Sequence, residues 1–324
     1  MRELLVGADI GGTSTKVGVA TSDGRVVSLA TGGPGNPNTV GLDGSAAQIH
    51  DVIDRALQGL SGNVVAVVIG LAGGSRAAAE APFLSAAVPH RVAVRPTLVS
   101  DLNVAFSTAT PAPQGYVIVA GTGSVAGHIV GADLVARRDG WGWLLGDQGS
   151  GYWLGREAVR STLAALDHER ELTPLQTAVL DAAASPDYLH LIQACYSHPP
   201  TWLSQFAPLV SQHADTDRAA GDIAQRAAQH LVDTVLSLKP QPSQPLVLGG
   251  SVLTTPGPVA RHFRTTIAQL LDNPVLTART GVVGALWIAA RTHGLQQADV
   301  HARLAASARE WRGADARVAK SRRN

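Results

Sequence analysis

Short apolar runs separated by turn residues dominate the first hundred residues of the chain. Runs of this kind predict β-strands. The predicted strands are Leu4–Ala8, Lys16–Ala20, Val26–Ala30, Val64–Leu71 and Thr97–Ser100. Between the third and the fourth strand, apolar residues recur at helical spacing and predict a helix over Ser45–Leu60. The first part of the chain is therefore expected to mix strands and helices.

A segment rich in structure-breaking residues, Thr108–Gln114, predicts a junction before a second β-rich region. Two further strands are predicted over Tyr116–Ala120 and Val125–Val130, joined by Gly121-Thr122-Gly123-Ser124. This plan repeats that of residues 4–20, in which a strand, a turn of glycine and hydroxyl residues and a second strand follow one another. The repeat predicts two related domains that face each other across a cleft.

The rest of the second half has mostly helical periodicity. Apolar stripes predict three helices, over Gly151–Leu166, from Ile223 to Leu238 and over Gly284–Arg291. A short buried strand is predicted at Leu246–Leu248, immediately before Gly249-Gly250-Ser251. The tail after Ala302 is rich in alanine and arginine without a clear apolar stripe, which predicts a solvated or frayed terminus. The expected division is an N-terminal domain at 1–107, a second domain at 108–292 and a C-terminal helix or tail at 293–324 that packs back on the protein or is frayed.

Composition narrows the functional classes. The chain has 324 residues, 45% of them hydrophobic, and a formal net charge of +1, which suits two globular domains and gives no argument for nucleic acid or membrane binding. Its single cysteine, Cys195, excludes a disulfide framework and an iron–sulfur cluster ligated within one chain. No secretory leader is recognisable, and no apolar run approaches the ~18 residues of a membrane span. A cytoplasmic location is expected.

The first turn combines residues that suit a phosphate group. Asp9 ends the first strand, and Gly11-Gly12-Thr13 follows it. Glycines let backbone N–H groups approach an anion closely, and hydroxyl groups add further donors. A carboxylate beside a polyphosphate implies a divalent metal between them, usually Mg²⁺ held through its waters. The alternative is an ordinary hairpin with a polar turn.

Three other features suit the same chemistry. Gly121–Ser124 offers a second turn of the same composition, and Gly249–Ser251 follows a strand in a way that suits a flat base and a ribose. Asp101 ends a strand, although a helix N-cap would explain it equally well. Each feature alone is weak evidence. Three glycine turns and two strand-end carboxylates in one chain are harder to explain as ordinary loops.

Two longer segments carry a family resemblance. One is Asp139-Gly140-Trp141-Gly142-Trp143-Leu144-Leu145-Gly146-Asp147-Gln148-Gly149-Ser150-Gly151-Tyr152-Trp153-Leu154-Gly155, and the other is Gly33-Pro34-Gly35-Asn36-Pro37. With the three turns, they make the chain resemble the BadF/BadG/BcrA/BcrD-type ATPases, and among them the N-acetylglucosamine kinases, over about residues 4–292. That group lies in the actin, hexokinase and Hsp70-like superfamily. The resemblance implies an α/β fold of two ribonuclease-H-like (actin/hexokinase-type) domains with an interdomain cleft.

The resemblance also implies roles for individual residues. It places ATP, with Mg²⁺ held by Asp9 through water, at Asp9, Gly11, Gly12, Thr13, Thr15, Lys16, Gly121, Thr122, Gly123, Gly249, Gly250 and Ser251. It places the sugar at Asn36, Asp101, Ser124, Gly140, Trp141, Gly142, Asp147 and Gln148. Asp101 would accept the proton of the attacking hydroxyl. Trp143 and Trp153 are expected to pack in the core instead.

The implied activity is an ATP-dependent amino-sugar kinase that phosphorylates the 6-hydroxyl of N-acetylglucosamine and works as a homodimer. Gln148 stands where most relatives carry Glu, which leaves the sugar open, and a glucosamine kinase is the nearest alternative. A more distant alternative is a non-catalytic sugar sensor or an ATPase activator on the same scaffold. An activator needs cysteines that hold a cluster between two subunits, and Cys195 lies in a helical stretch far from any glycine turn. A repressor needs DNA-binding helices ahead of the first strand, which begins at Leu4.

Overall fold

The computed structural model describes residues 2–71 and 81–321, with side chains up to residue 310. Contacts divide the chain into two compact units. Unit 1 comprises Met1–Gln114, Ile129–Leu134 and Ala278–Asn324, and unit 2 comprises Gly115–His128 and Val135–Thr277. The division differs from the expected boundaries chiefly at residues 278–292, which group with the N-terminal part of the chain because their helix packs on its sheet.

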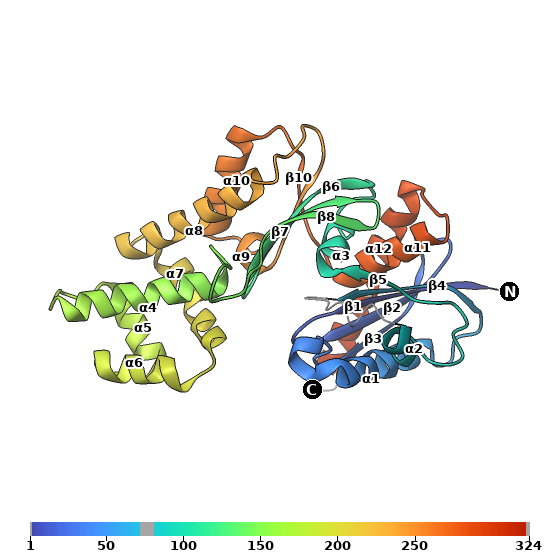
Figure 1. Cartoon of the computed structure of the whole chain (residues 1–324), viewed down its shortest axis with the longest axis horizontal. Helices are drawn as coiled ribbons and strands as arrows, with labels where there is room; N and C mark the ends of the chain where they lie inside the picture. The colour runs from blue at the N-terminus through green and yellow to red at the C-terminus, as the bar shows by residue number, and fades with distance from the viewer. Residues whose placement is uncertain (1, 72–80, 322–324) are drawn as a thin grey trace. The chain divides into compact units, whose positions relative to one another are not determined.

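Unit 1 is built on a five-stranded sheet of order β3-β2-β1-β4-β5 (Figure 1). Its elements are β1 (Glu3–Ile10), β2 (Thr15–Thr21), β3 (Val26–Gly32), α1 (Pro37–Leu57), β4 (Asn63–Leu71), α2 (Ala81–Ala86), β5 (Thr97–Ser100), α3 (Asp101–Ser107), α11 (Gly281–Thr292) and α12 (Ala298–Ser321). The β1–β2 and β2–β3 pairs are antiparallel, and the β1–β4 and β4–β5 pairs are parallel. All five strands predicted for this region are confirmed.

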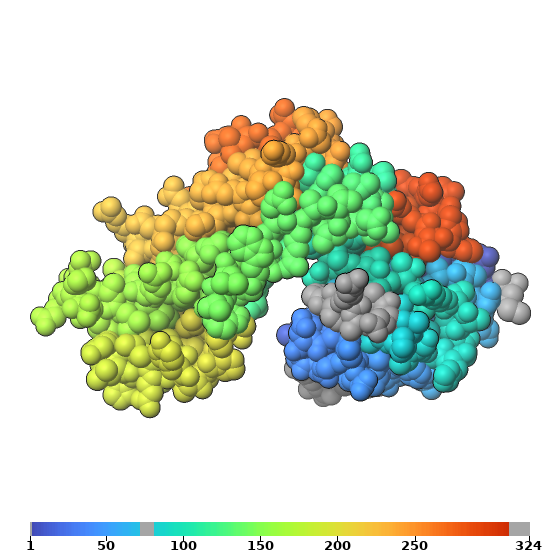
Figure 2. Space-filling model, in the orientation of Figure 1, coloured from blue at the N-terminus to red at the C-terminus, as the bar shows by residue number. Residues whose placement is uncertain are grey.

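Alternation along β1 explains the layers of unit 1. Leu4, Val6 and Ile10 belong to a core shared with α1 and α2, whereas Leu5 belongs to a core shared with α11 and α12. Helices therefore cover both faces of the sheet, and in the space-filling view α1 and the segment from α2 to α3 form much of the visible surface of the unit (Figure 2). A Cβ on Gly7 would overlap the backbone nitrogen of Leu286, so only glycine lets α11 lie this close to β1.

Unit 2 is built on a second sheet, of order β10-β9-β6-β7-β8, in which β9 is parallel to both β6 and β10. Its elements are β6 (Gln114–Ala120), β7 (Ser124–Val130), β8 (Asp133–Asp139), α4 (Gly151–Asp167), α5 (Pro174–Ala182), α6 (Tyr188–Ser197), the 3₁₀ helix η2 (Pro200–Phe206), α7 (Ala207–His213), α8 (Arg218–Leu236), β9 (Leu246–Gly249), α9 (Ser251–Thr254), α10 (Pro258–Leu270) and β10 (Val275–Thr277). Tyr116 and Ile118 of β6 join one core with α4, α8 and α10. None of the described helices is both long and apolar enough to cross a bilayer.

Sequence periodicity missed some elements for identifiable reasons. Helix α1 begins at Pro37 instead of Ser45, because its first turns are exposed and are interrupted at Gly41, whose φ of 74° is not helical. Strand β8 is largely exposed and β10 has only three residues, so neither shows a clear apolar pattern. At the start of the tail the solvated or frayed alternative is wrong, since Leu304 and Ala308 of α12 are buried and pack back on unit 1.

His301 helps to fix α12 within unit 1. Its ring is buried, Nε2 donates to the backbone oxygen of Ser107 at 2.9 Å, and the ring meets Trp287 edge-on at 5.4 Å between centroids. Burial lowers the pKa of His301, and the positive charge of Arg279 lowers it further, while the bond to Ser107 partly opposes them. The folded chain therefore holds this side chain in its neutral form.

Replacement of His301 by glutamine should make unfolding less sensitive to mild acid. The unfolded chain takes up a proton at this histidine near its ordinary pKa of ~6.5, above the pKa in the fold, so stability falls as the pH drops below that value. Glutamine can still donate to Ser107 but does not titrate in this range. We expect the melting temperature to fall less between pH 7 and pH 5.5 in His301→Gln than in the natural protein. Equal falls in the two proteins would contradict this role.

Candidate functional sites

The first glycine turn, Gly11–Ser14, lies in unit 1 between β1 and β2, and the Gly33–Pro37 segment packs against it. The N–H of Gly11 donates to Ser14 O at 3.0 Å, and Gly11 O accepts from the N–H of Gly35 at 3.2 Å. A Cβ on Gly35 would overlap Thr15 Oγ1, so the Gly35 backbone lies directly against the Thr15 side chain. Gly12 and Thr13 are exposed, whereas Thr15 is fully buried. The predicted phosphate-binding and sugar-binding segments of unit 1 are therefore neighbours.

Asn36 is the N-cap of α1. Its Oδ1 accepts from the N–H of Asn38 at 2.9 Å, which fixes the end of the Gly33–Pro37 segment. The capping bond uses the side-chain oxygen and leaves the amide nitrogen of this half-buried residue as a further donor. A structural role and a ligand-binding role for Asn36 are thus compatible.

Asp9, the last residue but one of β1, pairs with Lys16 of β2 and lies against the start of α11. A Cβ on Gly281, the first residue of α11, would overlap Asp9 Oδ2. Burial raises the pKa of Asp9, and the charge of Lys16 partly opposes that rise. The first turn of a helix favours a neighbouring negative charge. Among the described residues, no group of three or more His, Cys, Asp or Glu side chains could hold a metal, so Asp9 would supply a single carboxylate.

Asp101 is not the N-cap of α3. That position belongs to Ser100, whose Oγ accepts from the N–H of Asn103 at 3.2 Å. Asp101 is instead the first residue of the helix, and its Oδ1 accepts from the N–H of Leu102 at 3.0 Å. The N-cap role, which was the structural explanation for Asp101, therefore belongs to Ser100.

The second turn lies in unit 2 between β6 and β7 and is held by the first turn of α4. The N–H of Gly151 donates to Gly121 O at 2.7 Å, and that of Tyr152 donates to Thr122 O at 3.0 Å. Gly250, with a φ of 76°, lies so close to the end of β6 that a Cβ would overlap Ala120 O. The structure therefore brings together the second and third glycine turns, which are far apart in sequence.

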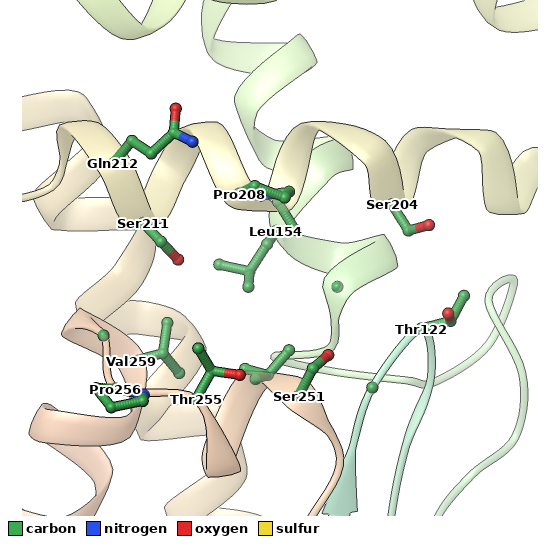
Figure 3. Close-up of a pocket in the computed structure, with 15 residues that line it drawn as sticks. Thr122, Leu154, Ser204, Pro208, Ser211, Gln212, Ser251, Thr255, Pro256 and Val259 are labelled. Atoms are coloured by element: carbon green, nitrogen blue, oxygen red, sulfur yellow. The ribbon is translucent and has the colours of Figure 1, made fainter. Parts of the chain in front are cut away.

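These two turns open onto a cavity of about 380 Å³ within unit 2 (Figure 3). Thr122, Ser251 and Leu154, the last of which belongs to the family segment, line it together with residues that carried no sequence motif. The latter include Ser204, Pro208, Ser211, Gln212, Thr255, Pro256 and Val259. They come from η2, α7 and the segment around α9 and α10, so only the fold could assemble them. An apolar wall with a few hydroxyl and amide groups is typical of a small-molecule site.

The Asp139–Gln148 segment folds back on the second turn. Ser124 donates its N–H to Asp147 Oδ1 at 3.1 Å and its Oγ to Gln148 O at 2.8 Å. Asp139, which the sequence analysis did not assign to the site, accepts the N–H groups of Asp147 and Gln148 at 2.8 and 2.9 Å. Gly140 and Gly142 have φ values of 69° and 84°. Ser124, Asp147 and Gln148 are thus neighbours, as predicted sugar-binding residues would have to be.

The chemistry of this segment is set by its exposure and charge. Desolvation raises the pKa of Asp147, the N–H of Ser124 lowers it, the nearby charge of Asp139 raises it and Arg137 lowers it. Trp141 is 70% exposed. The expectation of core packing holds for Trp153, which is 3% exposed, but is wrong for Trp143, which is 40% exposed and contacts Tyr152 edge-on.

Residues 6–289 match the BadF/BadG/BcrA/BcrD ATPase family. The chain belongs to this family. The N-acetylmuramic acid/N-acetylglucosamine kinase of Clostridium acetobutylicum is 27% identical over 195 residues, which cover 59% of this chain and 64% of that relative. The N-acetyl-D-glucosamine kinase of Dictyostelium discoideum and the glucosamine kinase of Vibrio cholerae are each 27% identical, over 79% and 76% of this chain and 87% and 84% of theirs.

A solved structure supports the fold over most of the chain. It is a protein of Chromobacterium violaceum, provisionally named an N-acetylglucosamine kinase, and it is 26% identical with a TM-score of 0.72. The alignment covers 88% of this chain and 98% of that one. The two five-stranded sheets described above agree with the predicted pair of ribonuclease-H-like domains.

Substitution of Ser251 by leucine should weaken ATP binding by at least about tenfold, because the larger side chain fills the cavity between the second and third turns. Ser251 is exposed, so the core of unit 2 should be unaffected. Ser197→Leu, an equal change on α6 away from the cavity, is the matched control. Calorimetric titration with ATP measures both variants. Unchanged ATP affinity in Ser251→Leu would exclude this cavity as the nucleotide site.

Proposed function

We propose that this protein is an ATP-dependent amino-sugar kinase that phosphorylates N-acetylglucosamine at its 6-hydroxyl. The observation that carries the proposal is that the second turn borders both the cavity of unit 2 and the carboxylate of Asp147. Thr122 lines the cavity of unit 2, and Ser124, two residues later, binds Asp147. A nucleotide cavity and a carboxylate suited to sugar hydroxyls thus begin at one turn, as a kinase requires. The names of the three kinase relatives favour an amino sugar as the acceptor.

Asp101 is the proposed acceptor of the proton from the attacking hydroxyl. Phosphoryl transfer has a loose transition state in most analyses, so positioning and charge neutralisation contribute more than proton removal. We therefore assign Asp101 mainly to aiming the hydroxyl. Its place at the start of α3, with the cap supplied by Ser100, fixes its backbone without using its own side chain as the cap.

Mg²⁺ fits the donor set around Asp9. This ion usually keeps several waters and binds through one or two carboxylates together with substrate phosphates. Asp9 supplies one such carboxylate beside an exposed turn of Gly12 and Thr13. When bound, the ion would neutralise charge on the ATP phosphates. Asp9 would hold it through water.

Glucosamine is the second candidate substrate, since the Vibrio cholerae relative is named for it. Its amine is cationic near neutral pH and favours a carboxylate within ~4 Å. Gln148 removes one such carboxylate from the segment, and the neutral N-acetyl sugar is therefore our first choice. A non-catalytic sensor is disfavoured because Asp9 and Asp101 are both present.

A coupled assay of ADP release tests the proposal. The panel is N-acetylglucosamine, glucosamine, N-acetylmannosamine and glucose, each with MgATP and with a sugar-free blank. We expect turnover above the blank with N-acetylglucosamine, and phosphorus NMR of the product should locate the phosphate at the 6-position. Absence of stimulation by every sugar of the panel would reject the kinase.

Replacement of Asp101 by asparagine should lower kcat by about 10²–10⁴-fold and leave the affinity for ATP near that of the natural protein. The reason is that asparagine loses one of the two oxygens that can aim the hydroxyl and cannot accept its proton, while nucleotide contacts are assigned elsewhere. Asp181→Asn, the same exchange at an exposed position of α5, is the control and should leave kcat and the affinity for ATP unchanged. If Asp101→Asn kept normal turnover, the assignment of this residue would be wrong.

Replacement of Gln148 by glutamate should shift specificity towards glucosamine. The backbone N–H and oxygen of Gln148 are held by Asp139 and Ser124, so the exchange need not disturb the loop. The added negative charge favours the cationic amine over the neutral amide. The ratio of kcat/KM values for the two sugars is the measurement. An unchanged ratio would show that the charge at position 148 does not determine specificity between the two sugars.

A further inference from the structure

Asp139 occupies a position that the proposed reaction has so far left without a role. The residue lies at the end of β8 and is 8% exposed. Its Oδ1 accepts from the N–H of Asp147 at 2.8 Å and its Oδ2 from the N–H of Gln148 at 2.9 Å, while Ser124 Oγ lies 3.4 Å from Oδ2. A buried carboxylate with a donor on each oxygen is hydrogen-bonded as a buried polar group requires. One side chain thus joins the start and the end of the Asp139–Gln148 segment.

The backbone joined in this way is in an uncommon conformation. Asp139 and Asp147 have φ values of 56° and 55°, in the left-handed region that non-glycine residues seldom adopt. Such a conformation persists only where its surroundings determine it. The bond from the Asp147 N–H to Asp139 fixes the residue at its backbone, and the bond from Ser124 to Asp147 Oδ1 fixes its side chain.

We propose that Asp139 is a positioning residue for the sugar site, which holds the Asp147 backbone so that the Asp147 carboxylate is presented beside Ser124. This inference rests on the proposed kinase function for its readout with sugar. Asp139 itself touches no reacting atom in this proposal. It acts through the two N–H groups that it binds.

Only a carboxylate meets the geometry at position 139. Each of the two N–H groups needs an acceptor, and aspartate offers two oxygens where asparagine offers one oxygen and a donor. The same geometry requires glycine at position 146, because a Cβ there would overlap Asp139 Oδ1. Gly146 is not in the left-handed region, so its backbone would accept alanine and the overlap would fall on the carboxylate.

Two variants separate position from charge. Asp139→Asn removes the charge and one acceptor, whereas Gly146→Ala retains the charge and displaces the carboxylate. Asp217→Asn is the control, because Asp217 is a comparable buried carboxylate of unit 2, 4% exposed, that accepts the N–H groups of Leu175 and Ala219 at 2.8 Å. All three are made in the full chain.

Amide hydrogen exchange without any ligand tests the positioning step directly. We expect faster exchange at Asp147 and Gln148 in Asp139→Asn and in Gly146→Ala than in the natural protein or in Asp217→Asn. Unchanged exchange at these two amides in both test variants would overturn the proposal, because it would mean that Asp139 does not hold them.

Kinetics then test whether the held segment serves the sugar. Both variants should raise KM for N-acetylglucosamine by ~10- to 100-fold, the loss expected for a hydrogen bond to a charged group, with KM for ATP within about twofold. An equal rise in both KM values, or none in that for the sugar, would overturn the role. If the natural protein shows no turnover with any sugar, the proposed function fails and so does this role, whatever the exchange data show.

The pH profile distinguishes the two variants from each other. Asp139 and Arg137 are the charged groups acting on Asp147, and Asp139 raises its pKa. Removal of that negative charge should let Asp147 stay ionised to lower pH. The acid limb of kcat/KM for the sugar should therefore move to lower pH in Asp139→Asn and not in Gly146→Ala or Asp217→Asn. If the variants acted only by disturbing the structure, the acid limb of kcat/KM would not move in Asp139→Asn alone.

Discussion

The contact between the second glycine turn and the first turn of α4 is the constraint on which unit 2 depends. Helix α4 begins with free N–H groups that need partners. Two of them, from Gly151 and Tyr152, are taken by the carbonyl oxygens of Gly121 and Thr122. The turn is thereby fixed in position, and its glycines leave no side chain in the way. On one side it borders the cavity, and on the other it meets the carboxylate of Asp147.

Unit 1 repeats the hairpin but supports it differently. Its turn is backed by Gly35, which approaches Thr15 so closely that no side chain would fit, and α11 packs against the sheet through Gly7. The two turns therefore have the same pattern in sequence, but different segments pack against them. In unit 1 that segment precedes α1, and in unit 2 it is the first turn of α4. This difference explains why the sequence repeat is visible at the hairpins and fades beyond them.

The sequence predicted well those parts that depend on local pattern. Apolar runs located every strand of the first sheet, and the first two glycine turns lie where they were predicted, between β1 and β2 and between β6 and β7. It failed where the structure depends on distant partners. The buried stripe of α12, with Leu304 and Ala308, packs against α11, and the cavity walls come from helices without a motif. Trp143 was misassigned because an aromatic residue carries no local sign of which face it presents.

The electrostatics of the Asp139–Gln148 segment give a physical reason for its one departure from the family pattern. Asp139 and Asp147 already place two carboxylates close enough for one to raise the pKa of the other. Glutamate at position 148 would add a third negative charge next to the N–H group that Asp139 accepts. Glutamine keeps a polar side chain there without that repulsion. The amide at 148 therefore leaves the two carboxylates of the segment without a third negative charge beside them.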